Sequence, residues 1–115
     1  MKLFAPLIAL MLLVFSFAVA QAAVVMTDHE ALAGNSAQSY DMQFFSGPNN
    51  FTISADWNQP NRHLQVCAEG SCVDSVTGHV ELSFVVDCST YCNIPFAVYN
   101  LAALNATYNL AVDKH

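Results

Sequence analysis

The chain has 115 residues and a formal net charge of −6, with three Lys or Arg residues against nine Asp or Glu residues. So few cations cannot neutralise a row of phosphates, which argues against a nucleic acid partner. The negative charge also argues against binding to anionic membranes and against a cationic antimicrobial role. Acidity of this kind keeps a small domain soluble.

Residues 1–22 have the pattern of a secretory signal peptide. Lys2 precedes an apolar run over residues 3–20, and an Ala-x-Ala cleavage site ends at residue 20 or at residue 22. An uncleaved membrane anchor is the alternative, because the run approaches spanning length. The first charged residues after it are Asp28 and Glu30 rather than basic residues, which favours cleavage. We therefore predict a secreted protein, periplasmic in a bacterium, with one domain and no membrane segment after cleavage.

Residues 23–39 are expected to form an N-terminal segment that is irregular or holds one short helix. Thr27 and Glu30 have the spacing of a capping box, ahead of the apolar residues 31–33. Gly34 is suited to end such a helix, and residues 35–39 are polar enough for a connection.

Residues 40–115 alternate apolar and polar side chains with period two, which indicates β-strands. Clusters of Gly, Pro, Asn and Ser at 46–50 and 58–61 indicate turns between them. The pattern predicts an all-β domain of about seven short strands, folded as a small antiparallel sandwich or barrel. The expected strands span residues 40–44, 51–57, 64–67, 72–76, 79–87, 94–101 and 107–112.

The tetrapeptide Tyr-Asn-Leu-Ala occurs at residues 99–102 and again at residues 108–111. The spacing is too short for a solenoid repeat. It fits two strands of one hairpin that turns near Asn105, or a chance similarity.

The four cysteines are Cys67, Cys72, Cys88 and Cys92, an even number that indicates two disulfides in an exported chain. Local pairing, Cys67 with Cys72 and Cys88 with Cys92, is favoured because the four residues between the first pair suit a hairpin. Crossed pairings would close longer loops and are favoured by chain entropy. A four-thiolate zinc site is a further alternative, although the spacings are not C-x2-C.

We find no residue pattern that indicates catalysis. The four histidines lack metal-binding spacings, and a Gly-x-Ser-x-Gly elbow and a phosphate-binding glycine loop are missing from the sequence. His79 and Glu81 share one face of an expected strand, where they form either a metal-ligand pair or a solvated face. The sequence therefore predicts a protein that is not an enzyme and that has no cofactor and no bound metal.

Two Asn-x-Thr sequons begin at Asn50 and Asn105, both at predicted turns. They predict glycosylation if the source is a eukaryote.

The loop residues Trp57, Arg62 and His63 are the candidate binding residues, because Trp and Arg are enriched among interface anchors. Trp57 also continues the apolar face of residues 51, 53 and 55, so a place in the core is its alternative role.

We predict a small, acidic, secreted binding module that contacts a protein partner through its loops or a strand edge. An effector-like role fits its size and cysteine content. The alternatives are a protease inhibitor that inserts a loop pinned by a disulfide, residues 68–71 or 89–91, and a carrier of a small apolar ligand. The identity of the partner and the oligomeric state stay open.

Overall fold

The computed structural model describes residues 23–44 and 46–115. The predicted signal peptide, residues 1–22, lies outside the described residues. Within the described ranges the chain contains no helix, and hence none of the length and apolarity that a membrane crossing requires.

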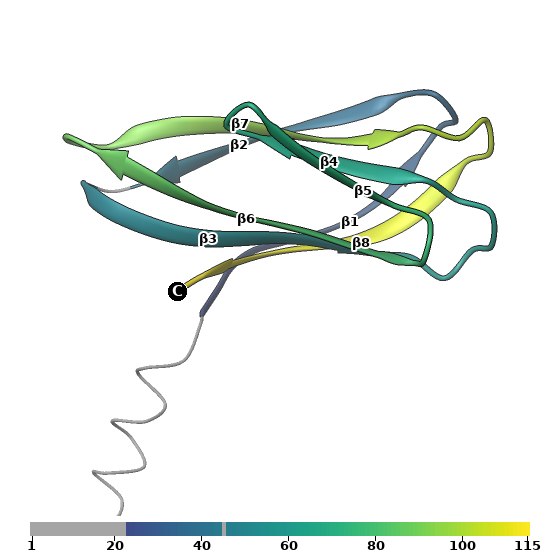
Figure 1. Cartoon of the computed structure of the whole chain (residues 1–115), viewed down its shortest axis with the longest axis horizontal. Helices are drawn as coiled ribbons and strands as arrows, with labels where there is room; N and C mark the ends of the chain where they lie inside the picture. The colour runs from purple at the N-terminus through teal and green to yellow at the C-terminus, as the bar shows by residue number, and fades with distance from the viewer. Residues whose placement is uncertain (1–22, 45) are drawn as a thin grey trace, which may run out of the picture.

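Eight strands make up the described chain (Figure 1). They are β1 (Ala23–Leu32), β2 (Ala37–Phe44), β3 (Gly47–Asp56), β4 (Leu64–Ala68), β5 (Ser71–Ser75), β6 (His79–Cys88), β7 (Cys92–Asn100) and β8 (Ala106–Lys114).

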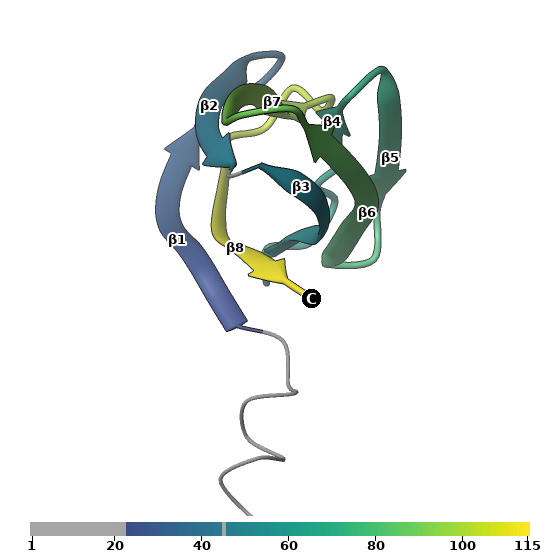
Figure 2. The same ribbon diagram turned by 90° about the vertical axis from the view of Figure 1, so that its left-hand side faces the viewer.

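The strands form two antiparallel four-stranded sheets, in the orders β1-β8-β3-β6 and β2-β7-β4-β5. Viewed from one end, the sheets lie face to face (Figure 2). Every connection between consecutive strands crosses from one sheet to the other, except the β4–β5 hairpin. The strand orders of the two sheets are those of an eight-stranded jelly roll. The predicted all-β sandwich is confirmed, with eight strands instead of about seven.

The additional strand is β1, so the prediction of a short helix near residues 27–33 is wrong. Residues 26–32 pair with β8 in continuous antiparallel register, from Met26 opposite Val112 to Leu32 opposite Ala106. A capping box contributes only about 1 kcal/mol to a helix, whereas this pairing satisfies the backbone of a whole strand. Long-range pairing therefore overrides the local signal, and β2 likewise begins within the expected connection at Ala37.

The core lies between the sheets and is built from the alternating apolar side chains. In β3, Phe51, Ile53 and Ala55 are buried, and the side chains between them face outward. Tyr40 stacks on Phe96 with ring centroids 4.9 Å apart, which joins β2 to β7. Burial of this period-two pattern on both sheets stabilises the sandwich.

The two Tyr-Asn-Leu-Ala segments do not form a hairpin. Residues 99 and 100 end β7, which pairs with β2 and β4, whereas residues 108–111 belong to β8, which pairs with β1 and β3. The chain passes from one sheet to the other between them.

Candidate functional site

Four connections gather at one end of the sandwich, on the right of Figure 1. They are residues 33–36, 57–63, 76–78 and 101–105, which link β1 to β2, β3 to β4, β5 to β6 and β7 to β8. We call the surface that they form the loop end. Loops on a rigid β-scaffold are where binding surfaces are commonly found.

Asn100 ties two of these loops together from inside. It is only 1% exposed, and its side-chain amide donates to the carbonyl oxygens of Leu32 (3.2 Å), Ala33 (3.2 Å) and Leu104 (2.8 Å). Its Oδ1 accepts from the amide of Ala102 at 3.1 Å. A buried amide with its polar atoms satisfied in this way fixes the geometry of the loops around it.

Arg62, in the loop between β3 and β4, joins that loop to the one between β7 and β8. Its Nε donates to the carbonyl oxygen of Asn105 and its Nη1 to that of Pro60, both at 2.6 Å. The amide of Leu101 also donates to the carbonyl oxygen of His63 at 2.8 Å. The guanidinium therefore contributes to loop structure as well as to the charge of this surface.

Gly34 is required by a close approach between loops. A Cβ atom on Gly34 would overlap the carbonyl oxygen of Ala103. The amide of Asn35 donates to the carbonyl oxygen of Ala102 at 2.9 Å at the same contact. The loop end is thus a preorganised surface, because its loops are held by hydrogen bonds and backbone packing before any partner arrives.

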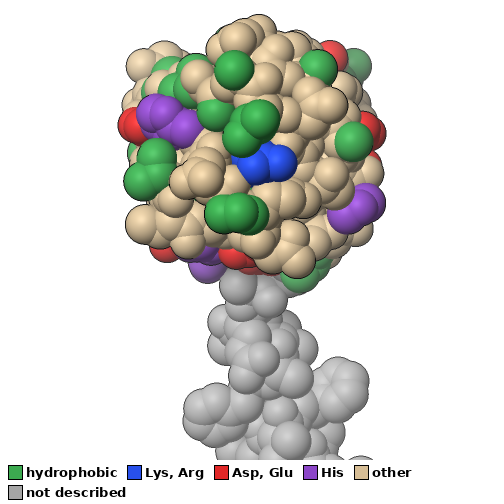
Figure 3. Space-filling model, turned by 90° about the vertical axis from the view of Figure 1, so that its right-hand side faces the viewer, with side chains coloured by type: hydrophobic (Ala, Val, Ile, Leu, Met, Phe, Trp, Pro, Cys, Tyr) green, Lys and Arg blue, Asp and Glu red, His purple; other side chains and the backbone are tan. Residues whose placement is uncertain are grey.

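Exposed apolar side chains stand among uncharged polar ones at the loop end, and its four loops carry no carboxylate. Leu101, Leu104 and Val76 are 42%, 51% and 67% exposed. None of the residues in the four loops is Asp or Glu, although the chain has nine such residues. Figure 3 looks onto this end and shows hydrophobic side chains around a basic side chain, with acidic side chains at the margin.

The three residues singled out for binding have different positions. Trp57 is 7% exposed and belongs to the core, which supports the alternative role considered for it. Arg62 lies at the loop end, where its guanidinium donates to the carbonyl oxygens of Asn105 and Pro60. His63 Nε2 donates to Asp74 Oδ2 at 2.5 Å, so its imidazole is paired with the edge strand β5.

His79 lies between two carboxylates on the outer face of β6. Its Nδ1 donates to Asp56 Oδ1 at 2.6 Å, and its Nε2 lies 3.5 Å from Glu81 Oε2. The hydrogen bond to Asp56, with Glu81 adding to it, raises the pKa of His79 above its usual value. In the described part of the chain, no three His, Cys, Asp or Glu side chains are grouped so that they could hold a metal ion.

A buried polar chain that the sequence did not suggest links three strands. Tyr108 donates to the hydroxyl oxygen of Tyr40 at 2.6 Å, and Tyr40 donates to Asp28 Oδ2 at 2.8 Å. Burial is the main cause that raises the pKa of both tyrosines, so both stay protonated donors. The sequence predicted a strand that begins at Tyr40, but not the partner of its hydroxyl group.

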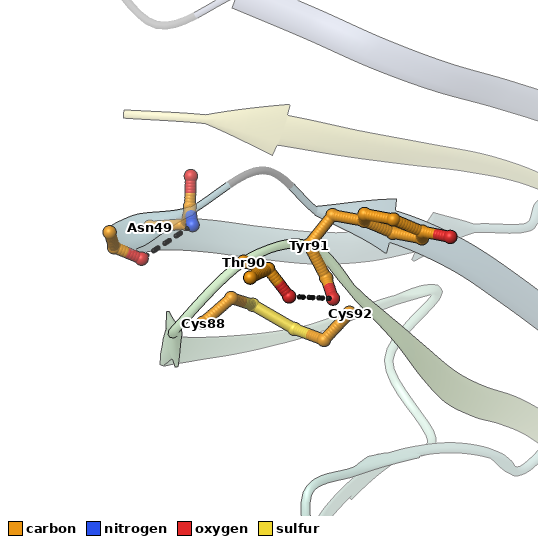
Figure 4. Close-up of a disulfide and its surroundings, with 6 residues drawn as sticks. Asn49, Cys88, Thr90, Tyr91 and Cys92 are labelled. Carbon is orange, nitrogen blue, oxygen red and sulfur yellow. Dashed lines mark hydrogen bonds between the residues drawn. A yellow bond between two sulfur atoms is a disulfide. The ribbon is translucent and has the colours of Figure 1, made fainter.

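The other end of the sandwich carries a disulfide. Cys88 is bonded to Cys92 across the turn between β6 and β7, and Cys67 is bonded to Cys72 in the β4–β5 hairpin. The predicted local pairing is therefore confirmed. In Figure 4 the side chain of Tyr91 points away from the Cys88–Cys92 disulfide, and it is 62% exposed.

The two sequons lie in different settings. Asn105 is exposed in the loop between β7 and β8, as expected. Asn50 is exposed but lies within β3, opposite Val85, so its expected place in a turn is wrong. Residues 47–50 belong to β3 instead, because this strand pairs with β6 from Gly47 onward.

No protein-family model matches the chain, and no curated protein sequence matches it. The fold does have a solved counterpart. The pre-peptidase C-terminal domain of collagenase from Bacillus anthracis superposes with a TM-score of 0.56 at 19% identity, over 76% of this chain and 87% of that one. A de novo designed double-stranded β-helix gives a TM-score of 0.44 at 11% identity, over 79% of this chain and 100% of that one. The likeness to the collagenase domain is one of fold.

Proposed function

We propose that the protein is an exported, non-catalytic binding module that docks a partner protein on its loop end. The observation that carries the proposal is the combination of exposed leucines, a basic side chain and no carboxylate on loops that are already fixed in place. Apolar and Arg side chains dominate the energetics of protein interfaces, and a preorganised surface loses little entropy on binding.

Export is supported by residues 1–22 and by the two disulfides, since disulfides persist in oxidising compartments. The structurally similar protein is itself one domain of a collagenase, which supports a module without its own active site. Mass spectrometry of the protein recovered outside the cytoplasm tests export directly. The proposal requires a chain that lacks residues up to about 20–22 and has both disulfides intact.

Site-specific photo-cross-linking in the source cells tests the docking surface. A photoreactive phenylalanine analogue replaces Leu104 in one variant and Val85, on the outer face of β6, in a matched control, since both side chains are exposed. We expect a discrete protein adduct at position 104 that unlabelled protein competes away and that unlabelled Leu101→Ser, Leu104→Ser protein does not. Equal adducts at both positions, or no adduct at 104, would overturn the proposal.

The protease-inhibitor alternative is tested by a third cross-linker position, Tyr91. This residue belongs to the loop pinned by the Cys88–Cys92 disulfide, between β6 and β7, at the end opposite the leucines (Figure 1). An adduct with a protease at position 91, and none at 104, would favour the inhibitor instead.

A further inference from the structure

A cavity of about 490 Å³ opens between the sheets at the end opposite the loop end. At this end the pairing of β1 with β8 brings the termini of the described chain together (Figure 2). It is formed by residues of β1, β2, β3 and β8. Small-molecule sites have volumes of about 300–1,000 Å³. The cavity is therefore large enough to hold a ligand.

The floor of the cavity is apolar. Met42 and Phe51 are buried, and Met26 is partly buried against the same core. Two flexible thioether side chains beside an aromatic ring adapt well to a linear alkyl chain. The side of a ligand that enters the cavity should thus be hydrocarbon.

Lys114 and Asp41 are the charged side chains that line the cavity, beside the polar side chains of Gln43 and Asn49. Along β8 the buried positions are 106, 108, 110 and 112, so alternation places Lys114 on the core-facing side, opposite Phe51 in the register. It is one of the two Lys or Arg side chains in the described ranges. Asp41 also lines the cavity, but it is an outward-facing neighbour of buried Met42 on β2.

We propose that this cavity binds a single-chain amphiphile with a carboxylate head, a medium-chain fatty acid. The carboxylate pairs with the ammonium group of Lys114, and the alkyl chain lies over Met26, Met42 and Phe51. The site is separate from the loop end and does not depend on the function proposed for it.

Calorimetric titration of the purified protein with dodecanoate, below its micelle concentration, tests the site. We expect saturable 1:1 binding, weakened about tenfold in Lys114→Met and changed less than about threefold in the matched control Lys114→Arg. Lys114→Met keeps most of the stem, and the side chain is exposed, so folding is retained.

A second variant and a second probe complete the test. Met26→Trp fills the cavity and should abolish dodecanoate binding, with the fold checked by circular dichroism. Dodecyltrimethylammonium should bind more weakly than dodecanoate if Lys114 sets the polarity and more tightly if Asp41 does. Absence of saturable binding, equal affinity of Lys114→Met, or preference for the cationic probe each overturns the proposal.

Discussion

The two ends of the sandwich are held in different ways. At the loop end, Asn100 and Arg62 bridge the loops by hydrogen bonds, and Gly34 lets two backbones touch. At the other end, the turn between β6 and β7 is closed by a covalent bond. A network of weak contacts holds a surface only if every member is in place, whereas a disulfide acts alone. We therefore expect point substitutions to be more damaging at the loop end.

The largest effect is expected from Gly34→Ala. The new methyl group overlaps the carbonyl oxygen of Ala103, and a backbone atom cannot move aside as a side chain can. We expect a loss of about 3 kcal/mol or more in the free energy of unfolding, measured with urea. Gly70→Ala is the matched control in the β4–β5 turn, where φ is 75° but nothing lies within 4 Å, and it should cost about 1–2 kcal/mol. Equal costs would contradict the close-contact argument.

Asn100→Ala comes next. It removes the donors to three carbonyl groups around a buried position and should cost about 2–4 kcal/mol. Asn109, at the same position of the second Tyr-Asn-Leu-Ala segment, is an exposed control whose side chain accepts from His29 Nδ1 at 2.6 Å. Asn109→Ala should change the unfolding free energy by less than about 0.5 kcal/mol. If the two substitutions cost the same, Asn100 does not organise the loops.

Replacing both Cys88 and Cys92 by Ala should lower the free energy of unfolding by about 2 kcal/mol, because the disulfide removes the entropy cost of closing this short loop. The amides of Asn35 and Ala102 should keep their hydrogen-exchange protection in this variant, because the loop end is held by its own contacts. Loss of that protection would show that the two ends are coupled.

The smallest effect on the free energy of unfolding is expected from a change in pH that titrates His79. His79 is protonated below its raised pKa and then pairs with Asp56 and Glu81. This contribution is complete below the unfolded value of about 6.5 and is lost as the pH rises through the raised pKa. Relative to the His79→Gln variant, the free energy of unfolding of the natural protein should rise by up to about 1 kcal/mol from pH 8 to pH 5.5. The effect is this small because the ion pair is exposed. Asp56→Asn should remove most of this difference; an unchanged difference would assign the effect to another group.

Sequence reasoning succeeded where the signal is local and periodic. Alternation alone indicated the core side of β3 and β6, and the short loop between Cys67 and Cys72 indicated the hairpin. It failed at β1, because the evidence for this strand lies in β8, far away in the chain. It also could not separate Asn100 from Asn109, which have identical neighbours in sequence and opposite environments in space. Loop contacts depend on topology, so the loop end was visible only once the fold was known.

The pairing of β1 with β8 has a consequence for the order of folding. The first described strand has no neighbour in its sheet until residues 106–114 have been synthesised. Contacts so distant in sequence form slowly. The sheet that contains β1 is therefore completed last, which fits the export proposed above, because a chain that crosses a membrane does so before it closes.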